Sequence, residues 1–198
     1  MKYYLAPMEG LTTYNFRTNW NRCYGGMDKY FTPFISNRHM NSRERNDVLP
    51  EHNVGMYTVP QILTNKAEEF LSLAEQLAGY GYHEVNLNLG CPSGTVTAKG
   101  KGSGMLRDLA KVDAFLDGVF SRTEGPVSVK TRLGVEKPEE FAAILEIYSR
   151  YPISELTRQF QLSGLRKKDM SAISSAVFLT KIKEIQAEIR KLDADMER

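Results

Sequence analysis

Strand-like and helix-like segments alternate along residues 1–157, and this alternation restricts the fold more than any other feature of the sequence. The strand-like segments are short and rich in β-branched and aromatic residues, and they lie at 3–8, 30–36, 59–64, 82–89, 127–132 and from 153 onward. Helical apolar spacing occurs at 14–23, 67–79, 106–120 and 138–148. Such alternation predicts a parallel α/β sheet, either open or closed into a barrel.

Two interruptions of this pattern carry expectations of their own. Pro33 lies near the middle of the segment 30–36, and a proline is tolerated at a sheet edge or a strand end better than in a paired centre. Residues 37–53 are polar and lack a clear period, so we expect a loop there.

The segment 84–93, with the sequence EVNLNLGCPS, places a single cysteine directly after a well-patterned strand. Apolar residues alternate there with Asn86 and Asn88, so one face of the strand is apolar and the other carries amide groups. A glycine and a proline then end the strand and hold Cys91 at its carboxyl end. Parallel α/β sheets keep their reactive groups at that end.

The composition restricts the class of protein. The chain has 198 residues, 41% of them apolar, as expected for one globular domain. We find neither a signal peptide nor an apolar segment near the roughly 20 residues that span a bilayer, so we expect a cytoplasmic protein with no membrane contact. Its two cysteines, Cys23 and Cys91, are too few for a disulfide framework or a zinc site. The net charge is only +2, so any contact with nucleic acid must come from local basic patches.

Several polar residues are expected at the carboxyl ends of different strands. A lone cysteine in an apolar setting is more often a packing residue than a catalytic one. Here a parallel barrel would bring Cys91 and seven other residues around one pocket: Pro7, Met8, Gln61, Asn86, Asn88, Lys130 and Arg132.

These segments resemble the tRNA-dihydrouridine synthases in composition, order and spacing. The similar segments are APMEG at 6–10, Gln61, NLNLGCP at 86–92 and KTRLG at 130–134, and the resemblance covers about residues 2–157. It implies a (β/α) TIM-type barrel that binds FMN and uses NADPH to reduce the C5–C6 double bond of uridines in tRNA.

The resemblance also implies roles for individual residues. Cys91 would donate a proton to uracil C5, a task that suits a thiol, since cysteine thiols ordinarily titrate near pH ~8.5. Asn88 would help to hold a uracil flipped out of its stack. The residues implied to contact the flavin are Pro7, Met8, Glu9, Gln61 and Lys130, with Lys130 placing a positive charge against the reduced ring. Those implied to contact tRNA are Lys99, Lys101 and Arg132.

The sequence leaves the roles of two loops open, one at residues 94–104 and one at residues 38–45. The glycine-rich stretch 94–104 does not match a phosphate-binding P-loop. We interpret it as a mobile active-site loop whose Lys99 and Lys101 touch tRNA phosphates, with a solvated loop as the alternative. The basic residues between 38 and 45 suit either an RNA contact or an ordinary solvated surface. His52 and His83 have no metal-ligand spacing, and Cys23 is expected to pack on the first helix.

Residues 158–198 form a different module. A basic linker precedes a helix whose apolar residues at 178–196 follow the spacing of a coiled-coil seam. The barrel is therefore expected to be incomplete, with five to six strands, open edges, an uncovered apolar interior and no loops for the flavin phosphate. A whole barrel needs about 250 residues. The seam would cover the gap, dimerise the chain or bind a partner helix.

Three functions follow from these features. The first is an FMN-dependent tRNA-dihydrouridine synthase whose isolated chain binds flavin weakly. The second is another FMN barrel that acts on a small pyrimidine such as dihydroorotate. The third is a non-catalytic remnant that acts through its C-terminal helix.

Overall fold

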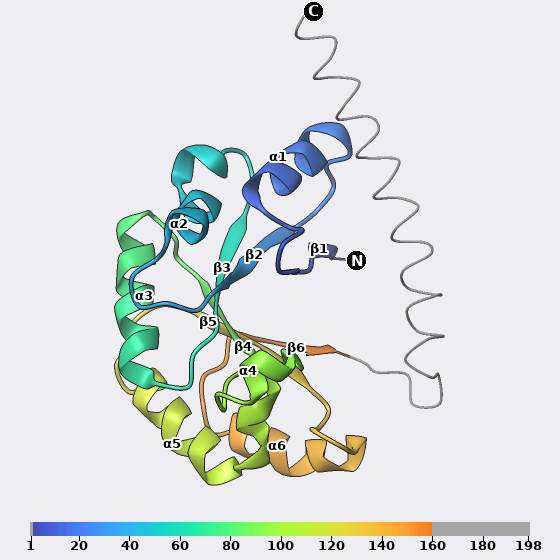
Figure 1. The fold of residues 1–198 in the computed structure, drawn as a ribbon, viewed down its shortest axis with the longest axis vertical. Coiled ribbons are helices and arrows are strands. Elements are labelled where there is room, and N and C mark those ends of the chain that lie inside the picture. Colours follow the sequence, from blue (N-terminus) through green and yellow to red (C-terminus); the bar gives the residue numbers. More distant parts are fainter. Residues whose placement is uncertain (1, 160–198) are drawn as a thin grey trace, which may run out of the picture. The chain divides into compact units, whose positions relative to one another are not determined.

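The computed structural model describes residues 2–159 of the chain and shows one sheet of six parallel strands. The strands follow each other in sequence order across the sheet, as in a (β/α) barrel, and the sheet is curled into part of one (Figure 1). They are β1 (Tyr4–Leu5), β2 (Lys29–Ile35), β3 (Thr58–Ile62), β4 (Val85–Leu89), β5 (Val127–Arg132) and β6 (Glu155–Gln159). The linker was expected from residue 158, but β6 extends through Gln159. The rest of the expected linker and the seam at 178–196 lie outside the described residues.

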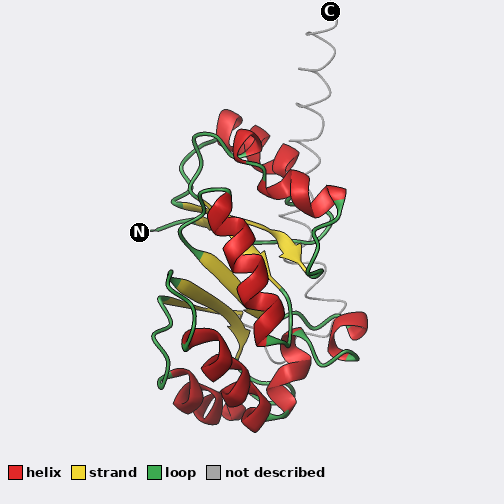
Figure 2. Cartoon of the chain, turned by 90° about the vertical axis from the view of Figure 1, so that its left-hand side faces the viewer, coloured by secondary structure: helices red, strands yellow, loops and turns green. Residues whose placement is uncertain are grey.

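Helices cover the outer face of this sheet (Figure 2). The longer ones are α1 (Tyr14–Cys23), α3 (Ala67–Gly79), α5 (Leu109–Phe120) and α6 (Phe141–Tyr148), the last preceded by the 3-10 turn η3 (Pro138–Glu140). Apolar residues of β3, β4 and β5 pack against α3, α5 and α6 in one buried cluster that includes Phe70, Leu87, Leu116 and Ile144. Among the described helices, none has both the length and the apolar character that crossing a bilayer requires.

The long periodic segments were predicted correctly, and the expected loop at 37–53 was wrong. That segment contains α2 (Ser42–Val48) and the 3-10 turn η1 (Pro50–His52). The Asn41 side chain caps α2 by accepting from the Glu44 N–H, and the Glu44 carboxylate accepts in turn from the Asn41 N–H. The Asn-x-x-Glu spacing was a visible signal for this helix. The helix is mostly polar, so its sequence shows no apolar residues at helical spacing.

Of the two positions expected to suit Pro33, a sheet edge or a strand end, the sheet edge is excluded. β2 lies between β1 and β3, so the proline is in an interior strand. The pairing of β2 with β3 shifts register between Phe31 and Phe34, and the irregularity accommodates a residue that has no N–H to donate.

The inner face of the sheet is polar, which corrects the expected uncovered apolar interior. Gln61, Asn86, Asn88 and Ser128 are buried there and hydrogen-bond to one another. At the amino end of the strands, an ion-pair cluster formed by Lys29, Glu84 and Glu155 fills the curl.

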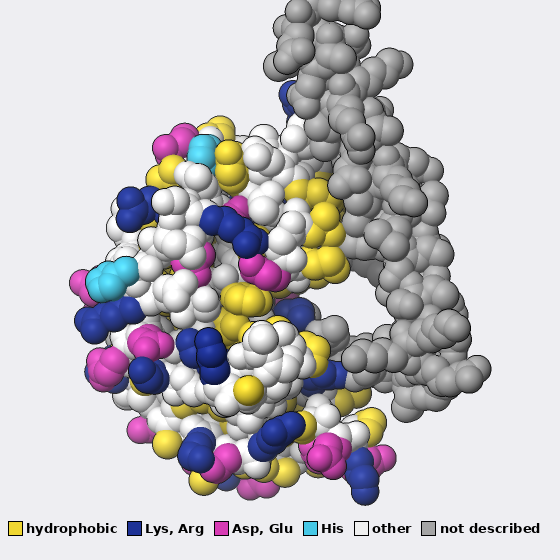
Figure 3. Space-filling model, viewed as in Figure 1, with side chains coloured by type: hydrophobic (Ala, Val, Ile, Leu, Met, Phe, Trp, Pro, Cys, Tyr) yellow, Lys and Arg dark blue, Asp and Glu magenta, His cyan; other side chains and the backbone are white. Residues whose placement is uncertain are grey.

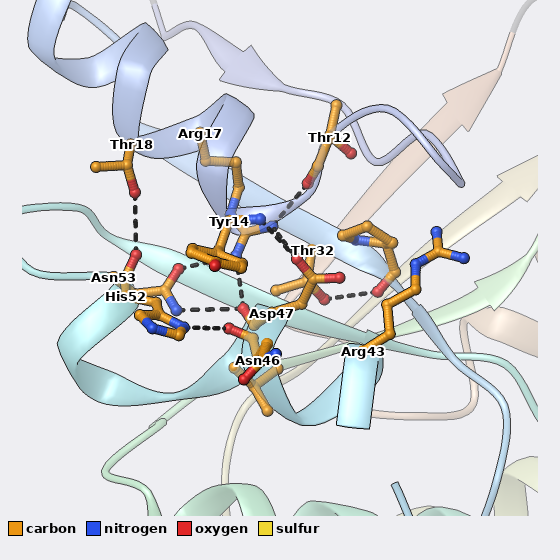
Figure 4. A network of polar contacts seen from close by, with 12 residues as sticks. Thr12, Tyr14, Arg17, Thr18, Thr32, Arg43, Asn46, Asp47, His52 and Asn53 are labelled. Atoms are coloured by element: carbon orange, nitrogen blue, oxygen red, sulfur yellow. Dashed lines mark hydrogen bonds and ion pairs between the residues drawn. The ribbon is translucent and has the colours of Figure 1, made fainter. Parts of the chain in front are cut away.

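A buried arginine joins the first helix to α2 and the turn that follows it (Figure 4). The Arg17 guanidinium donates to the carbonyl oxygens of Thr12 and Asp47 and to the Asn53 side chain, at 2.5–2.9 Å. Burial lowers the pKa of Arg17 to about 10, and the nearby Asp47 carboxylate opposes this shift. Because the Tyr14 N–H also donates to Asp47, the start of α1 is fixed to α2.

Candidate active site

Strand β4 carries two amide side chains into the interior of the curled sheet. Its apolar residues pack outward in the core cluster, so the period-two alternation turns Asn86 and Asn88 inward. The Asn86 amide donates to the Ser128 hydroxyl at 3.0 Å, and Asn86 Oδ1 accepts from Gln61 at 2.7 Å. The expected two-faced strand is therefore confirmed.

Gln61 on β3 connects the two asparagines. Its Nε2 donates to Asn86, and its Oε1 accepts from Asn88 Nδ2 at 2.8 Å. With only 1% of its surface exposed, Gln61 is held in one orientation by both ends of its amide. One N–H of that amide remains for a ligand.

The turn after β4 holds the cysteine through its main chain. Asn88 Oδ1 accepts the N–H groups of Gly90 and Cys91, at 3.0 and 2.9 Å. The Cys91 carbonyl oxygen accepts from both the N–H and the hydroxyl of Ser103, each at 3.0 Å. A Cβ on Gly90 would lie 3.3 Å from the Thr131 backbone, so the turn also packs closely on β5. Cys91 itself is half-buried.

Lys130 lies beside this turn, opposite Asn88 in the pairing of β4 with β5. Burial lowers the pKa of the Lys130 ammonium, and the neighbouring Arg132 lowers it further, whereas its interaction with Cys91 raises it. The sequence-predicted Cys91, Asn88, Gln61 and Lys130 thus come together at the carboxyl end of β3, β4 and β5.

The segment after β1 forms a tight turn at the same end of the sheet. The Met8 N–H donates to the Thr12 hydroxyl, and the Met8 carbonyl accepts from the N–H of Thr12, across Gly10 with its positive φ of 76°. The side chain of Met8 is 46% exposed. Pro7 is half-buried. Glu9 forms an ion pair with Arg43 at 2.8 Å on the rim of a small polar cavity of about 110 Å³.

The stretch 94–104 is more ordered than a simple loop. It forms a short helix α4 (Gly94–Thr97) and enters the 3-10 segment η2 (Gly102–Arg107). Lys101 donates to the Ser36 carbonyl at 3.3 Å, and Asn65 donates to the Lys99 carbonyl at 2.9 Å. The stretch therefore folds back over the ends of β2 and β3. The Lys99 side chain is exposed and Lys101 is half-buried.

The remaining polar residues of the sequence analysis divide between surface and packing. Arg38, His39 and Arg45 are exposed. Cys23 is also exposed on α1, so of the core and surface positions expected for it the core position is excluded. Lys and Arg side chains are interspersed with Asp and Glu on the face drawn in Figure 3, with no single basic patch. His52 stacks on Tyr14, with ring centroids 4.0 Å apart. Within residues 2–159 no group of His, Cys, Asp and Glu could hold a metal ion.

Sequence reasoning missed Ser103, whose hydroxyl and N–H both reach the Cys91 carbonyl. The sequence around Ser103 gives no signal for this contact, because the contact depends on how residues 94–104 fold back. A hollow of about 630 Å³ lies between α3 and the turn at 122–126, and none of the predicted site residues lines it.

A family model described as dihydrouridine synthase (Dus) matches residues 4–157. The chain belongs to the dihydrouridine synthase family. A probable tRNA-dihydrouridine synthase of Staphylococcus aureus is 30% identical over 179 residues, which cover 86% of this chain and 52% of that protein. One from Staphylococcus epidermidis is 31% identical over 183 residues, with the same two shares. The probable tRNA-dihydrouridine synthase 1 of Synechocystis is 30% identical over 146 residues, covering 71% of this chain and 41% of that protein.

The family match confirms the resemblance and the incomplete (β/α) barrel. The chain spans about half the length of the curated dihydrouridine synthases that it matches. The match to the staphylococcal proteins covers 86% of this chain, which is more than the part at residues 4–157 that the family model matches.

Proposed function

We propose that this chain carries the proton-donating half of a tRNA-dihydrouridine synthase, an FMN-dependent oxidoreductase that uses NADPH to reduce uridine to dihydrouridine. The observation that carries the proposal is the Cys91 turn. Asn88 accepts the N–H groups of Gly90 and Cys91, and Lys130 lies opposite Asn88 in the pairing of β4 with β5. Family membership supports the same reaction.

The residues of the chain would divide the work as follows. The Cys91 thiol donates its proton to C5 of the uracil, as a general acid whose approach is set by the fixed turn. The second N–H of the Asn88 amide would orient the base, since the other polar groups of Asn88 bond to Gln61, Gly90 and Cys91. A uracil reaches this position only after leaving its stack in the RNA.

The residues present fit the ring portion of a flavin. Lys130 is a half-buried cation, of the kind that stabilises an anionic reduced ring, and it lies opposite Asn88, which donates to Gln61. Pro7, Met8 and Glu9 would line the same end of the barrel from β1. Bound FMN, reduced by NADPH, would supply the hydride for C6. We expect the isolated chain to hold flavin weakly, because the sequence after residue 157 does not resemble the strands and phosphate-binding loops with which the family's barrel continues.

The proposed partner is tRNA. Lys99 and Arg132 would contact its phosphates, and Lys101 would do so only by leaving the Ser36 carbonyl. A tRNA substrate agrees with the cytoplasmic location expected from the sequence. The seam at 178–196 is proposed to dimerise the chain or to bind a partner helix.

The experiment combines a flavin spectrum with a product assay. Purified chain is titrated with FMN, and unmodified tRNA is incubated with chain, FMN and NADPH and analysed for dihydrouridine by mass spectrometry. We expect dihydrouridine with the wild type and a loss of at least about 100-fold with Cys91→Ala. Cys23→Ser is the matched control, because this second cysteine is exposed on α1.

Two outcomes would replace the proposal. Turnover of dihydroorotate without any action on tRNA would favour the small-pyrimidine enzyme. Cellular effects that survive Cys91→Ala but are abolished by Ile185→Asp with Ile189→Asp would favour a binding module.

A further inference from the structure

We infer that Ser103 is a positioning residue for Cys91, and that the fold-back segment 99–104 controls how firmly the thiol is held. The inference rests on the proposed function for its catalytic consequence. The hold itself is a property of the described chain and is testable without tRNA or flavin.

The Cys91 main chain is held on both sides by side chains from different parts of the sequence. Its N–H donates to Asn88, three residues earlier in the chain. Its carbonyl oxygen accepts two hydrogen bonds from Ser103, twelve residues later, one of them from a hydroxyl. Ser103 is only 4% exposed, so its hydroxyl has little access to water and its bond to Cys91 is not easily replaced.

Glycine next to Ser103 makes this close approach possible. A Cβ on Gly102 would lie 2.7 Å from the Cys91 carbonyl oxygen and 3.1 Å from the Cys91 Cβ, and its φ of +57° disfavours other residues as well. A Cβ on Gly104 would lie 2.7 Å from the Thr97 carbonyl oxygen. Gly102 therefore serves the contact with the cysteine turn and Gly104 the packing on α4, and a phosphate cradle is not needed to explain them.

The segment that carries Ser103 is fixed to the neighbouring strands. Lys101 bonds the carbonyl of Ser36 after β2, and Asn65, after β3, bonds the carbonyl of Lys99. Movement of the β2 and β3 loops would thus reach Ser103 and, through it, Cys91. A tRNA that drew Lys101 away from the Ser36 carbonyl would therefore also change how firmly the Cys91 thiol is positioned.

The test measures the rate at which iodoacetamide alkylates Cys91 in the full-length chain with the Cys23→Ser substitution, by peptide mass spectrometry across pH 6 to 9. Ser103→Ala removes the hydroxyl and keeps the N–H bond. We expect Cys91 to react about fivefold faster, the factor that corresponds to losing one hydrogen bond of ~1 kcal/mol. Ser93→Ala is the matched control, because the Ser93 hydroxyl is exposed in the same turn and contacts Thr95.

Three outcomes decide the inference. A faster reaction of Ser103→Ala, with Ser93→Ala like the parent and both unfolding at the parent's urea midpoint within error, supports it. Equal alkylation rates in Ser103→Ala and Ser93→Ala overturn it. If Ser103→Ala lowers the urea midpoint, alkylation is repeated at graded urea concentrations, and a rate difference that disappears at equal unfolded fraction also overturns it.

The catalytic consequence separates this inference from the proposed function. Under that function, Ser103→Ala lowers the rate of dihydrouridine formation at saturating tRNA and leaves the KM for tRNA unchanged. If alkylation changes as expected while the wild type forms no dihydrouridine, the hold on Cys91 stands and the proposed function fails.

Discussion

The ammonium group of Lys29 on β2 lies 2.8 Å from the carboxylate of Glu155 on β6, although three strands separate them in the sheet. The same ammonium group lies 2.9 Å from Glu84, just before β4. The Tyr4 hydroxyl of β1 donates to Glu155 at 3.3 Å. The curl of the sheet therefore brings both of its outer strands into one cluster at their amino ends.

Removing the cation should destabilise the protein. Burial lowers the pKa of Lys29, but its bonds to Glu155 and Glu84 outweigh burial and leave the pKa above its ordinary value of 10.5. Its contribution is therefore fully present at neutral pH and is lost only in alkali. Lys29→Met would leave the Glu84 carboxylate buried and unpaired, which should cost about 3 kcal/mol in urea unfolding at pH 7.

Lys111→Met is the control for that measurement. Lys111 pairs with Asp108 at 2.9 Å, as close as Lys29 is to Glu84, but its side chain is 79% exposed. An exposed pair of this kind contributes at most about 0.5 kcal/mol. Equal free energies of unfolding for the two variants would show that the cluster of Lys29, Glu84 and Glu155 does not stabilise the curled sheet.

A second stability prediction concerns pH and Glu140. Hydrogen bonds from the N–H of Val135, and then of Lys137, hold the pKa of the Glu140 carboxyl below its ordinary 4.5. The folded-state pKa lies below the unfolded one, so the contribution is present above pH 4.5 and is lost as pH falls through the lowered value. Glu140→Gln should be less stable than wild type at pH 6.5, and the difference should shrink toward pH 3. A difference that persists unchanged in acid would contradict this assignment.

The polar layer inside the curl gives a third prediction. Asn86→Ala would remove the bond from Gln61 and the bond to Ser128, leaving buried polar groups unsatisfied. We expect a loss of about 2 kcal/mol in the free energy of unfolding. Ser72→Ala, on the outer surface of α3, should change it by less than about 0.5 kcal/mol. A result for Asn86→Ala as small as that of Ser72→Ala would mean that water replaces the missing amide.

The parts of the fold that were predictable are those fixed by local pattern. β5 has the expected bounds because its period-two pattern is complete within the segment, and α1 because Thr13 precedes it and the glycines at 25 and 26 follow it. The same period placed Asn88 inward and Cys91 at the strand end. α2 was missed because its only strong signal, the Asn41 and Glu44 capping box, is a helix start without an apolar face.

The parts that were missed depend on distance in sequence. Lys29 and Glu155 are each ordinary charged residues at the start of a strand, and only the curl of six strands brings them together. Ser103 meets Cys91 only because the intervening segment returns over β2 and β3. Sequence period fixes which face of a strand a residue occupies. It does not fix how strongly the sheet bends, on which the contact of Lys29 with Glu155 depends, or where a loop folds back, on which the contact of Ser103 with Cys91 depends.

Lys130 provides the sharpest test of the flavin assignment. Burial places its pKa below the ordinary value of 10.5, with Cys91 acting in the opposite direction. Lys130→Met would remove the cation while keeping much of the aliphatic stem, and should lower dihydrouridine formation about 100-fold, the usual effect of losing one charge-stabilising group. FMN titration followed by flavin fluorescence should show weaker binding, and reduced flavin should lose more affinity than oxidised flavin because the reduced ring is anionic. Lys111→Met, an exposed lysine of α5, should change neither quantity. If Lys130→Met bound oxidised and reduced FMN as the wild type does, Lys130 would be a structural neighbour of Cys91, and the flavin would have to be sought elsewhere on the barrel.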